Sequence, residues 1–219
     1  DDNGHGTAVT SIAAAIGGNS LVMAGVNWKC RIMPVKVTGV DRSAQYSNLI
    51  SGLAFAADRG AKVINMSVAG TDVSSALQDG VTYAASKGAI IVAGMGNGNN
   101  ETPNFPAAYS NVIAVGATDS SDKRAVPFCS GEAGSNFGNH IDFVAPGQLV
   151  VGLSHTDPTT ALLWCGTSFA TAMTSGVVSL LCSLNPSLSF DQVYAALKAG
   201  AKDQAVSYTH LTLPTNREV

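Results

Sequence analysis

Residues 47–93 read SNLISGLAFAADRGAKVINMSVAGTDVSSALQDGVTYAASKGAIIVA, and this stretch decides the fold class. It contains one sequence pattern twice, in which a helical segment ends at Arg-Gly-Ala or Lys-Gly-Ala and is followed by a short apolar strand. This repeated pattern predicts helices over 47–58 and 74–87 and strands over 63–66 and 89–93. Apolar strands that alternate with helices are typical of a parallel sheet covered on both faces. We therefore expect an α/β protein, a three-layer sandwich with a mostly parallel central sheet and helices on both faces.

The rest of the chain continues this pattern. Apolar runs predict three further strands, over residues 30–37, 112–117 and 141–145. Two further helices are predicted, from Phe169 to about Leu184 and from Phe190 to about Leu197.

The composition excludes several classes of protein. Only 12% of the 219 residues are charged, 46% are hydrophobic, and the net charge is −3. These values exclude a disordered chain and, without a basic stripe, argue against a nucleic-acid binder. The mean hydropathy is +0.20, but no apolar run approaches the roughly 18 residues that a spanning helix needs. We expect no nucleic-acid partner, no membrane span and a monomer.

The four cysteines form no Cys-x-x-Cys pair, which argues against a zinc or thioredoxin-like site. Cys182 lies in an apolar run, where a buried free thiol is expected. Cys129 and Cys165 each precede a turn of small residues, and a disulfide between them is one alternative among the pairings that stay open.

Small and polar residues follow two of the predicted strands, at 67–70 and 94–98. In sheets of this kind, ligands bind at the carboxyl ends of the strands. Asn97, a neutral amide donor, lies in the second of these segments.

His5 lies between two glycines at a predicted helix start, and Ser168 begins the most apolar helix, where its backbone N–H can donate to an oxyanion. Taken singly, His5 would be an exposed loop histidine and Ser168 a helix N-cap.

Four motifs occur in a fixed order. They are Asp-Asn-Gly-His-Gly-Thr at 2–7, Val-Ile-Asn-Met-Ser at 63–67, Ala-Gly-Met-Gly-Asn at 93–97 and Gly-Thr-Ser-Phe-Ala at 166–170, with shorter matches at 35–37, 105–107, 112–117 and 144–147. Together they resemble the subtilisin-like serine peptidases, or subtilases, over about residues 1–200. The resemblance implies a secreted serine endopeptidase that acts on polypeptides and needs no cofactor for its chemistry.

The resemblance also assigns roles. Ser168 is expected to be the nucleophile, His5 the general base and then the general acid, and Asn97 an oxyanion donor together with the Ser168 N–H. The substrate-binding residues that it implies are a strand of Ser67, Val68 and Ala69, a pocket wall of Gly94, Met95 and Gly96, and an opposite strand of Arg42, Ser43 and Ala44. The wall is apolar and uncharged, so we expect a neutral, bulky apolar substrate residue before the cut.

A calcium loop is a further implication of the resemblance. Its oxygen donors would be the Asn19 side chain and the carbonyls of Leu21 and Met23. Calcium takes about six to eight oxygens, including carboxylates, and the family's carboxylate ligand would lie upstream. An ordinary glycine-rich turn is the alternative.

The sequence departs from the family in four places. The triad aspartate is missing, since the family carries it on a strand some thirty residues before the histidine, and Asp1 and Asp2 are too close to His5 to replace it. Ala172 and Met173 stand where the family has Pro-His, Ala8 replaces a second histidine, and Arg42 replaces a glycine. Without the aspartate the chain is expected to be nearly inactive.

Two other functions remain as alternatives. A pseudo-peptidase, acting as a binding or structural module on the same fold, is favoured by the missing aspartate and by Ala172 and Met173, although nucleophile and base are both kept. Another class of serine hydrolase is disfavoured because no Gly-x-Ser-x-Gly motif occurs.

The character of the sequence changes at Val206. Residues 206–215 read VSYTHLTLPT, which can be read as the translation of a sequencing adapter. We expect residues 1–205 to be a partial subtilase catalytic domain, truncated at both ends, and residues 206–219 to be a non-native tail. A divergent native end is the alternative.

Overall fold

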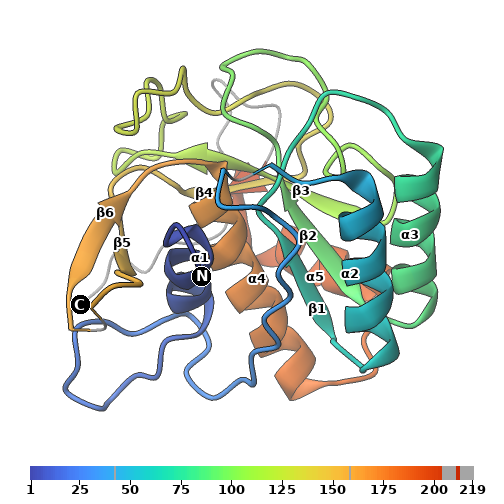
Figure 1. Cartoon of the computed structure of the whole chain (residues 1–219), viewed down its shortest axis with the longest axis horizontal. Helices are drawn as coiled ribbons and strands as arrows, with labels where there is room; N and C mark the ends of the chain where they lie inside the picture. The colour runs from blue at the N-terminus through green and yellow to red at the C-terminus, as the bar shows by residue number, and fades with distance from the viewer. Residues whose placement is uncertain (42, 158, 204–210, 213–219) are drawn as a thin grey trace.

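The computed structural model of the chain describes residues 1–219 except for 42, 158, 204–210 and 213–219 (Figure 1). The four helices with predicted ranges and four of the five predicted strands are present, with their ends shifted by at most three residues, and a helix also begins at His5 as predicted. The elements follow in the order α1 (His5–Ala14), α2 (Tyr46–Asp58), β1 (Val63–Met66), α3 (Ser75–Ser86), β2 (Ile90–Gly94), β3 (Val112–Thr118), β4 (Phe143–Pro146), β5 (Val150–Leu153), β6 (Ala161–Trp164), α4 (Thr167–Leu184), α5 (Phe190–Gly200), β7 (Lys202–Asp203) and β8 (Leu211–Thr212).

The central sheet has the strand order β1-β2-β3-β4-β8-β7, and all its neighbours are parallel except the pair β7 and β8. Asn65 of β1 faces Val92 of β2, which in turn faces Ile113 of β3. A separate antiparallel hairpin joins β5 and β6. Parallel neighbours require a crossover, which is α3 between β1 and β2, whereas β2, β3 and β4 follow one another without a helix between them.

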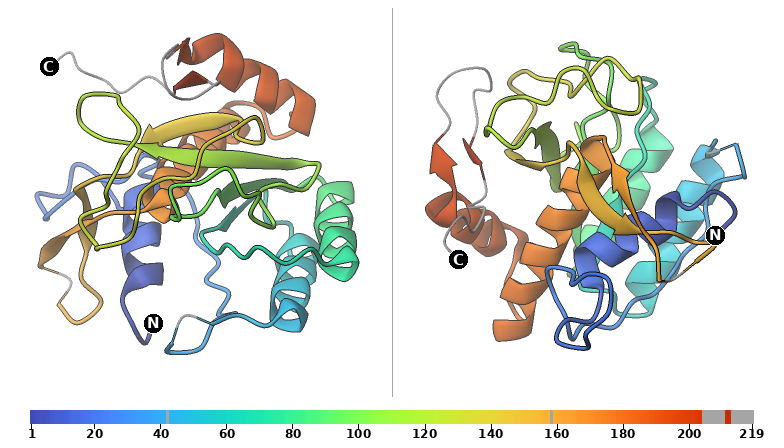
Figure 2. Two further views of the ribbon diagram at one scale, coloured as in Figure 1. Left: turned by 90° about the horizontal axis from the view of Figure 1, so that it is seen from above. Right: turned by 90° about the vertical axis from the view of Figure 1, so that its left-hand side faces the viewer.

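Alternate residues of β2 enter the two cores on opposite faces of the sheet. Ile91 packs in the core that α2 and α3 cover, whereas Ile90 and Val92 pack in the core that α4 and α5 cover. Both faces of β2 and β3 are buried. Figure 2 shows α5 on one side of the sheet and α2 and α3 on the other. The three-layer α/β arrangement is therefore confirmed.

Helix α4 is the central helix of the fold and contacts β1, β2, β3 and β4. Its 18 residues, with a mean hydropathy of 1.4, are long and apolar enough to cross a membrane, but 56% of them are buried within the protein. Gly176 allows α1 to approach, since a Cβ at this position would lie 2.5 Å from the Val26 Cβ and 3.1 Å from the Ala13 carbonyl oxygen. These contacts identify α4 as a core helix.

The prediction of a strand over residues 30–37 is wrong. The structure assigns no strand there, and β1 forms the edge of the described sheet. A cavity of about 2450 Å³ is lined by both residues 30–39 and residues 63–70. A strand is defined by its backbone hydrogen bonds to a neighbour, and the cavity separates this segment from the edge of β1.

A disulfide joins Cys129 to Cys165, with 5.6 Å between their Cα atoms. This is the bridge that the sequence left as one alternative. Cys182 is a buried free thiol, as expected, and burial raises its pKa. Of the predicted tail, only Leu211 and Thr212 are described, as strand β8, and the rest lies outside the described residues.

Candidate active site

Ser168 lies in the first turn of α4. Gly166 precedes the helix with a φ of 145°, a conformation that L side chains rarely adopt. Its N–H donates to the carbonyl of Gly147 at 2.8 Å, which ties this turn to the end of β4. The turn places a half-buried Ser168 on the wall of the large cavity.

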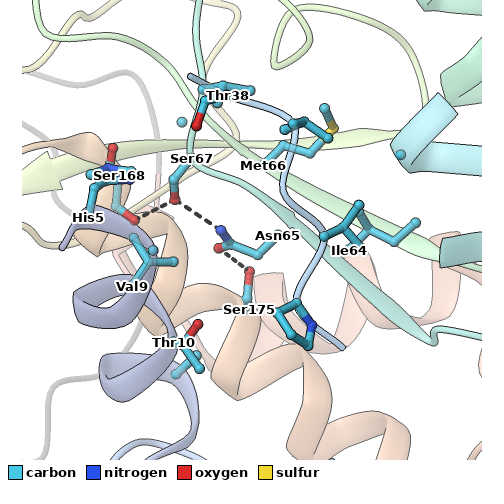
Figure 3. Close-up of a pocket in the computed structure, with 18 of the residues that line it drawn as sticks. His5, Val9, Thr10, Thr38, Ile64, Asn65, Met66, Ser67, Ser168 and Ser175 are labelled. Atoms are coloured by element: carbon cyan, nitrogen blue, oxygen red, sulfur yellow. Dashed lines mark hydrogen bonds between the residues drawn. The ribbon is translucent and has the colours of Figure 1, made fainter. Parts of the chain in front are cut away.

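His5 is the first residue of α1 and lines the same cavity. The centroid of its imidazole ring lies 5.7 Å from that of Phe169, the residue after Ser168. Figure 3 shows His5 and Ser168 next to each other, each in the first turn of its helix. The structure thus brings together two residues that are 163 positions apart in the sequence.

Asn97 follows β2 and contacts the residue before Ser168. Its Oδ1 accepts the backbone N–H of Thr167 at 3.0 Å and the Thr167 Oγ1 hydroxyl at 2.9 Å. Its Nδ2 donates to Oε1 of Glu132 at 2.9 Å. The amide oxygen is therefore bonded to Thr167, and the nitrogen lies beside Gly166, where a Cβ would be 3.3 Å from Nδ2.

A chain of hydrogen bonds supports the nucleophile turn from below (Figure 3). Ser67 Oγ donates to the Ser168 carbonyl at 2.8 Å, and Asn65 Nδ2 donates to Ser67 Oγ at 3.0 Å. Ser175 Oγ, two turns further along α4, donates to Asn65 Oδ1 at 2.9 Å. We did not single out Asn65 or Ser175 in the sequence. The signal was the polar Asn65 within the apolar strand VINM, because a polar side chain that is taken out of water needs a hydrogen-bond partner.

Two of the three residues expected in the pocket wall line the cavity. Gly94 and Gly96 do so, together with Ser67, Val68 and Ala69. Met95 does not line it, because its side chain is fully buried in the core that α2 and α3 cover. The Met95 side chain therefore does not belong to the expected pocket wall.

Gly94 is small because α4 packs directly upon it. A Cβ at Gly94 would lie 3.1 Å from Thr171 Oγ1 and 3.2 Å from Thr167 Oγ1. A side chain there would push the first turn of α4, and with it Ser168, away from the sheet.

The opposite strand of the expected substrate groove is described only in part. Ala44 forms an isolated antiparallel bridge with Thr38, and both Ser43 and Ala44 line the cavity. Arg42 lies outside the described residues.

The expected calcium ligands do not form a calcium site by themselves. Asn19 Oδ1 accepts the backbone N–H of Leu21 at 3.1 Å, which makes a local turn. Within the described part of the chain, no group of three or more His, Cys, Asp or Glu side chains could hold a metal ion. The charged oxygens that calcium prefers are not supplied by Asn19, Leu21 and Met23.

The two carboxylates next to His5 have structural roles. Asp1 caps α1, because its Oδ1 accepts the Gly4 N–H at 3.1 Å and its Oδ2 accepts the Thr7 N–H at 2.6 Å. Asp2 forms an exposed ion pair with Lys36, whose hydrogen bond and charge lower the pKa of Asp2. These contacts agree with the expectation that both are loop residues.

Comparisons with known proteins point to one family. A family model described as "Subtilase family" matches residues 1–212. Thermitase from Thermoactinomyces vulgaris is 41% identical over 187 residues, which cover 85% of this chain and 64% of that protein. Subtilisin BL from Lederbergia lenta is 37% identical over 199 residues, covering 90% of this chain and 70% of that protein. The solved structure of Sphericase has a TM-score of 0.82 and 28% identity, covering 92% of this chain and 70% of that one.

The chain is shorter than these relatives. It spans 64% of thermitase and 50% of the alkaline elastase YaB of Bacillus sp. (strain YaB). The motifs around His5, Asn97 and Ser168, the parallel sheet that brings them together and the match over residues 1–212 agree with one another. The chain belongs to the subtilase family.

Proposed function

We propose that the protein containing this chain is a serine endopeptidase, with Ser168 as nucleophile, His5 as general base and Asn97 as oxyanion donor. The observation that carries the proposal is that three distant segments of the chain meet at one cavity. α1, the end of β2 and the first turn of α4 bring these residues to one cavity wall from distant parts of the sequence. Family membership supports the same reaction.

The proposed reaction uses these groups in sequence. His5 takes the proton from Ser168 Oγ as this oxygen bonds to the scissile carbonyl carbon, whose oxygen becomes negatively charged. Asn97 Nδ2 and the Ser168 N–H donate hydrogen bonds to that oxyanion. His5 then gives the proton to the leaving amine nitrogen as the C–N bond breaks, and water releases the acyl group by the same steps. No cofactor takes part in these steps.

The proposal is tested by labelling. A fluorophosphonate probe should label the full-length protein at Ser168 and leave the Ser168→Ala variant unlabelled, because the probe reacts with an activated serine. Circular dichroism of both proteins checks that they are folded. If the folded full-length protein is not labelled, the proposal is wrong.

The loss of the oxyanion donor gives a graded prediction. Asn97→Ala should lower kcat of the full-length protein by about 10²–10³ with little change in KM, the loss seen on removing this donor in subtilisin. The matched control is Asn48→Ala, because Asn48 is exposed on α2 and does not line the cavity. An unchanged kcat in Asn97→Ala would remove this residue from the mechanism.

The apolar wall gives a prediction on specificity. Peptides with Phe before the cut should be cleaved about tenfold or more faster, in kcat/KM, than the same peptides with Lys, since an unpaired charge is costly to bury. A second peptide pair, with the same exchange placed five residues further from the cut, serves as the control. Equal cleavage after Lys and Phe would contradict the prediction.

The third member of the triad is proposed to come from upstream. Asp1 and Asp2 are engaged by the α1 N-terminus and by Lys36. Between residues 30–39 and β1 lies the cavity, and β1 is the edge strand of the described sheet. One more strand could pair with β1 there, which fits the family's aspartate-bearing strand. We therefore propose that residues 1–219 alone have very low turnover.

A pseudo-peptidase on the same fold is the second candidate. Ala172 and Met173 favour it, since they replace the Pro-His of the family next to the nucleophile helix turn. Ala172 is fully buried in the core formed with α1, so the fold accommodates it. The labelling experiment separates the two candidates, because a pseudo-peptidase would bind polypeptides without forming a covalent adduct at Ser168.

We also propose that the protein acts outside the cytoplasm as a monomer. The disulfide between Cys129 and Cys165 supports an oxidising compartment, where such bonds persist.

A further inference from the structure

One charged side chain of the site has no part in the proposed reaction. Glu132 is exposed at the rim of the cavity that His5, Asn97 and Ser168 line. Its Oε1 accepts a hydrogen bond from Asn97 Nδ2 at 2.9 Å. This nitrogen is the one that the mechanism needs as oxyanion donor.

The orientation of the Asn97 amide follows from the chemistry of its partners. The backbone N–H of Thr167 can only donate, so the atom facing it at 3.0 Å is the amide oxygen. An ionised Glu132 can only accept, so the atom facing it is the amide nitrogen. Glu132 therefore holds one of the two protons of the donor group itself.

The carboxylate is held in place by its own turn. Ser130 Oγ donates to Glu132 Oε2 at 2.9 Å, and the Phe128 N–H donates to the Glu132 carbonyl at 3.1 Å. The disulfide ties Cys129 of this turn to Cys165, three residues before Ser168. The turn that carries Glu132 is thus covalently fixed to the turn that carries the nucleophile.

A carboxylate in this place competes with the reaction. Hydrogen bonds to a charged acceptor are about twice as strong as bonds between neutral groups. An interaction made before the reaction and weakened in the transition state raises the barrier. When an oxyanion forms beside Asn97, only the second Nδ2 proton is free to reach it, and turning the amide toward the oxyanion weakens the bond to Glu132.

We propose that Glu132 is a positioning residue that restrains the Asn97 amide and so lowers the rate of acyl transfer to Ser168. The inference rests on the proposed peptidase function, since it assigns an inhibitory carboxylate to that same site. The inhibition acts through Asn97, and its strength depends on the charge of the carboxylate.

The test is Glu132→Gln in the full-length protein. The glutamine keeps the size and an acceptor oxygen but removes the charge, so kcat on a neutral peptide should rise about five- to tenfold while KM stays within twofold. Glu101→Gln is the matched control, because Glu101 is an exposed carboxylate outside the cavity lining and its exchange changes the net charge equally. Its kcat should remain unchanged.

The Asn97→Ala background tests the route. If Glu132 acts through Asn97, its exchange for glutamine should change kcat less than twofold there. A gain that persists undiminished in this background would overturn the inference. So would an unchanged or lower kcat in Glu132→Gln alone, and a fall would mean that the carboxylate supports the donor.

The two proposals fail differently. If the folded wild-type protein is neither labelled by fluorophosphonate nor active on peptides, both the peptidase function and the inhibition by Glu132 are contradicted. If the wild-type protein is labelled and active, but Glu132→Gln does not raise kcat, only the inhibition by Glu132 is contradicted.

Discussion

Replacing Ser168 with alanine is expected to lower kcat of the full-length protein by about 10⁶, the loss known for the nucleophile of subtilisin. Ser168 Oγ forms the bond to the substrate carbon, and the neighbouring Thr167 hydroxyl is bonded to Asn97 Oδ1 at 2.9 Å. His5→Ala should cost about as much, since the alcohol is a weak nucleophile without a base. The double variant should lose no more than either single variant, because the two residues act as one unit.

The measurement is kcat on one peptide substrate for both single variants and the double variant. Ser51→Ala is the matched control, because Ser51 is an exposed helical serine that only donates to the Ser47 carbonyl. A loss of about 10¹² in the double variant, the product of the two single losses, would mean that Ser168 and His5 act independently. A loss below tenfold in Ser168→Ala would contradict the assignment of the nucleophile.

The second large effect concerns the upstream carboxylate. Extending residues 1–219 by the segment that precedes them in the full-length protein should raise kcat by about 10⁴, because the aspartate of such a triad is worth about 3 × 10⁴ in subtilisin. The physical reason is that the carboxylate fixes the imidazole tautomer and stabilises the imidazolium.

The structure gives this prediction a second readout. The added strand should pair with β1, whose residues Val63, Ile64 and Asn65 are only half buried while β2 is fully buried. Amide hydrogen exchange in β1 should therefore slow in the extended protein. The control is the extended protein with its upstream triad aspartate changed to asparagine, which should keep the protection of β1 but lose most of the gain in kcat. Equal kcat for the extended and the unextended chain would contradict the prediction.

The order and type of the elements could be predicted from local patterns. The repeated pattern at residues 47–93 predicted α2, β1, α3 and β2, because hydrophobic periodicity and glycine caps depend only on residues that are close together in the sequence. The same reasoning failed for residues 30–37, since a strand also needs a neighbouring backbone. Apolarity alone cannot supply that neighbour.

The candidate site was predictable where motifs carry it. His5, Asn97 and Ser168 stand in short motifs, and the structure places all three on one cavity. Met95 was assigned to the pocket wall because it lies within a motif, but its side chain faces the core. Sequence proximity to a site does not determine on which side of the backbone a side chain lies.

The sequence by itself determined the α/β class, the family and the three residues that carry the proposed chemistry, because each depends on short segments of the chain. Only the tertiary structure decided which polar groups surround them. The contact of Glu132 with Asn97 spans 35 positions, that of Ser175 with Asn65 spans 110, and the pairing of Cys129 with Cys165 was one of several alternatives. Such contacts arise when the parallel sheet and α4 bring distant segments to one edge, and no local pattern encodes that distance.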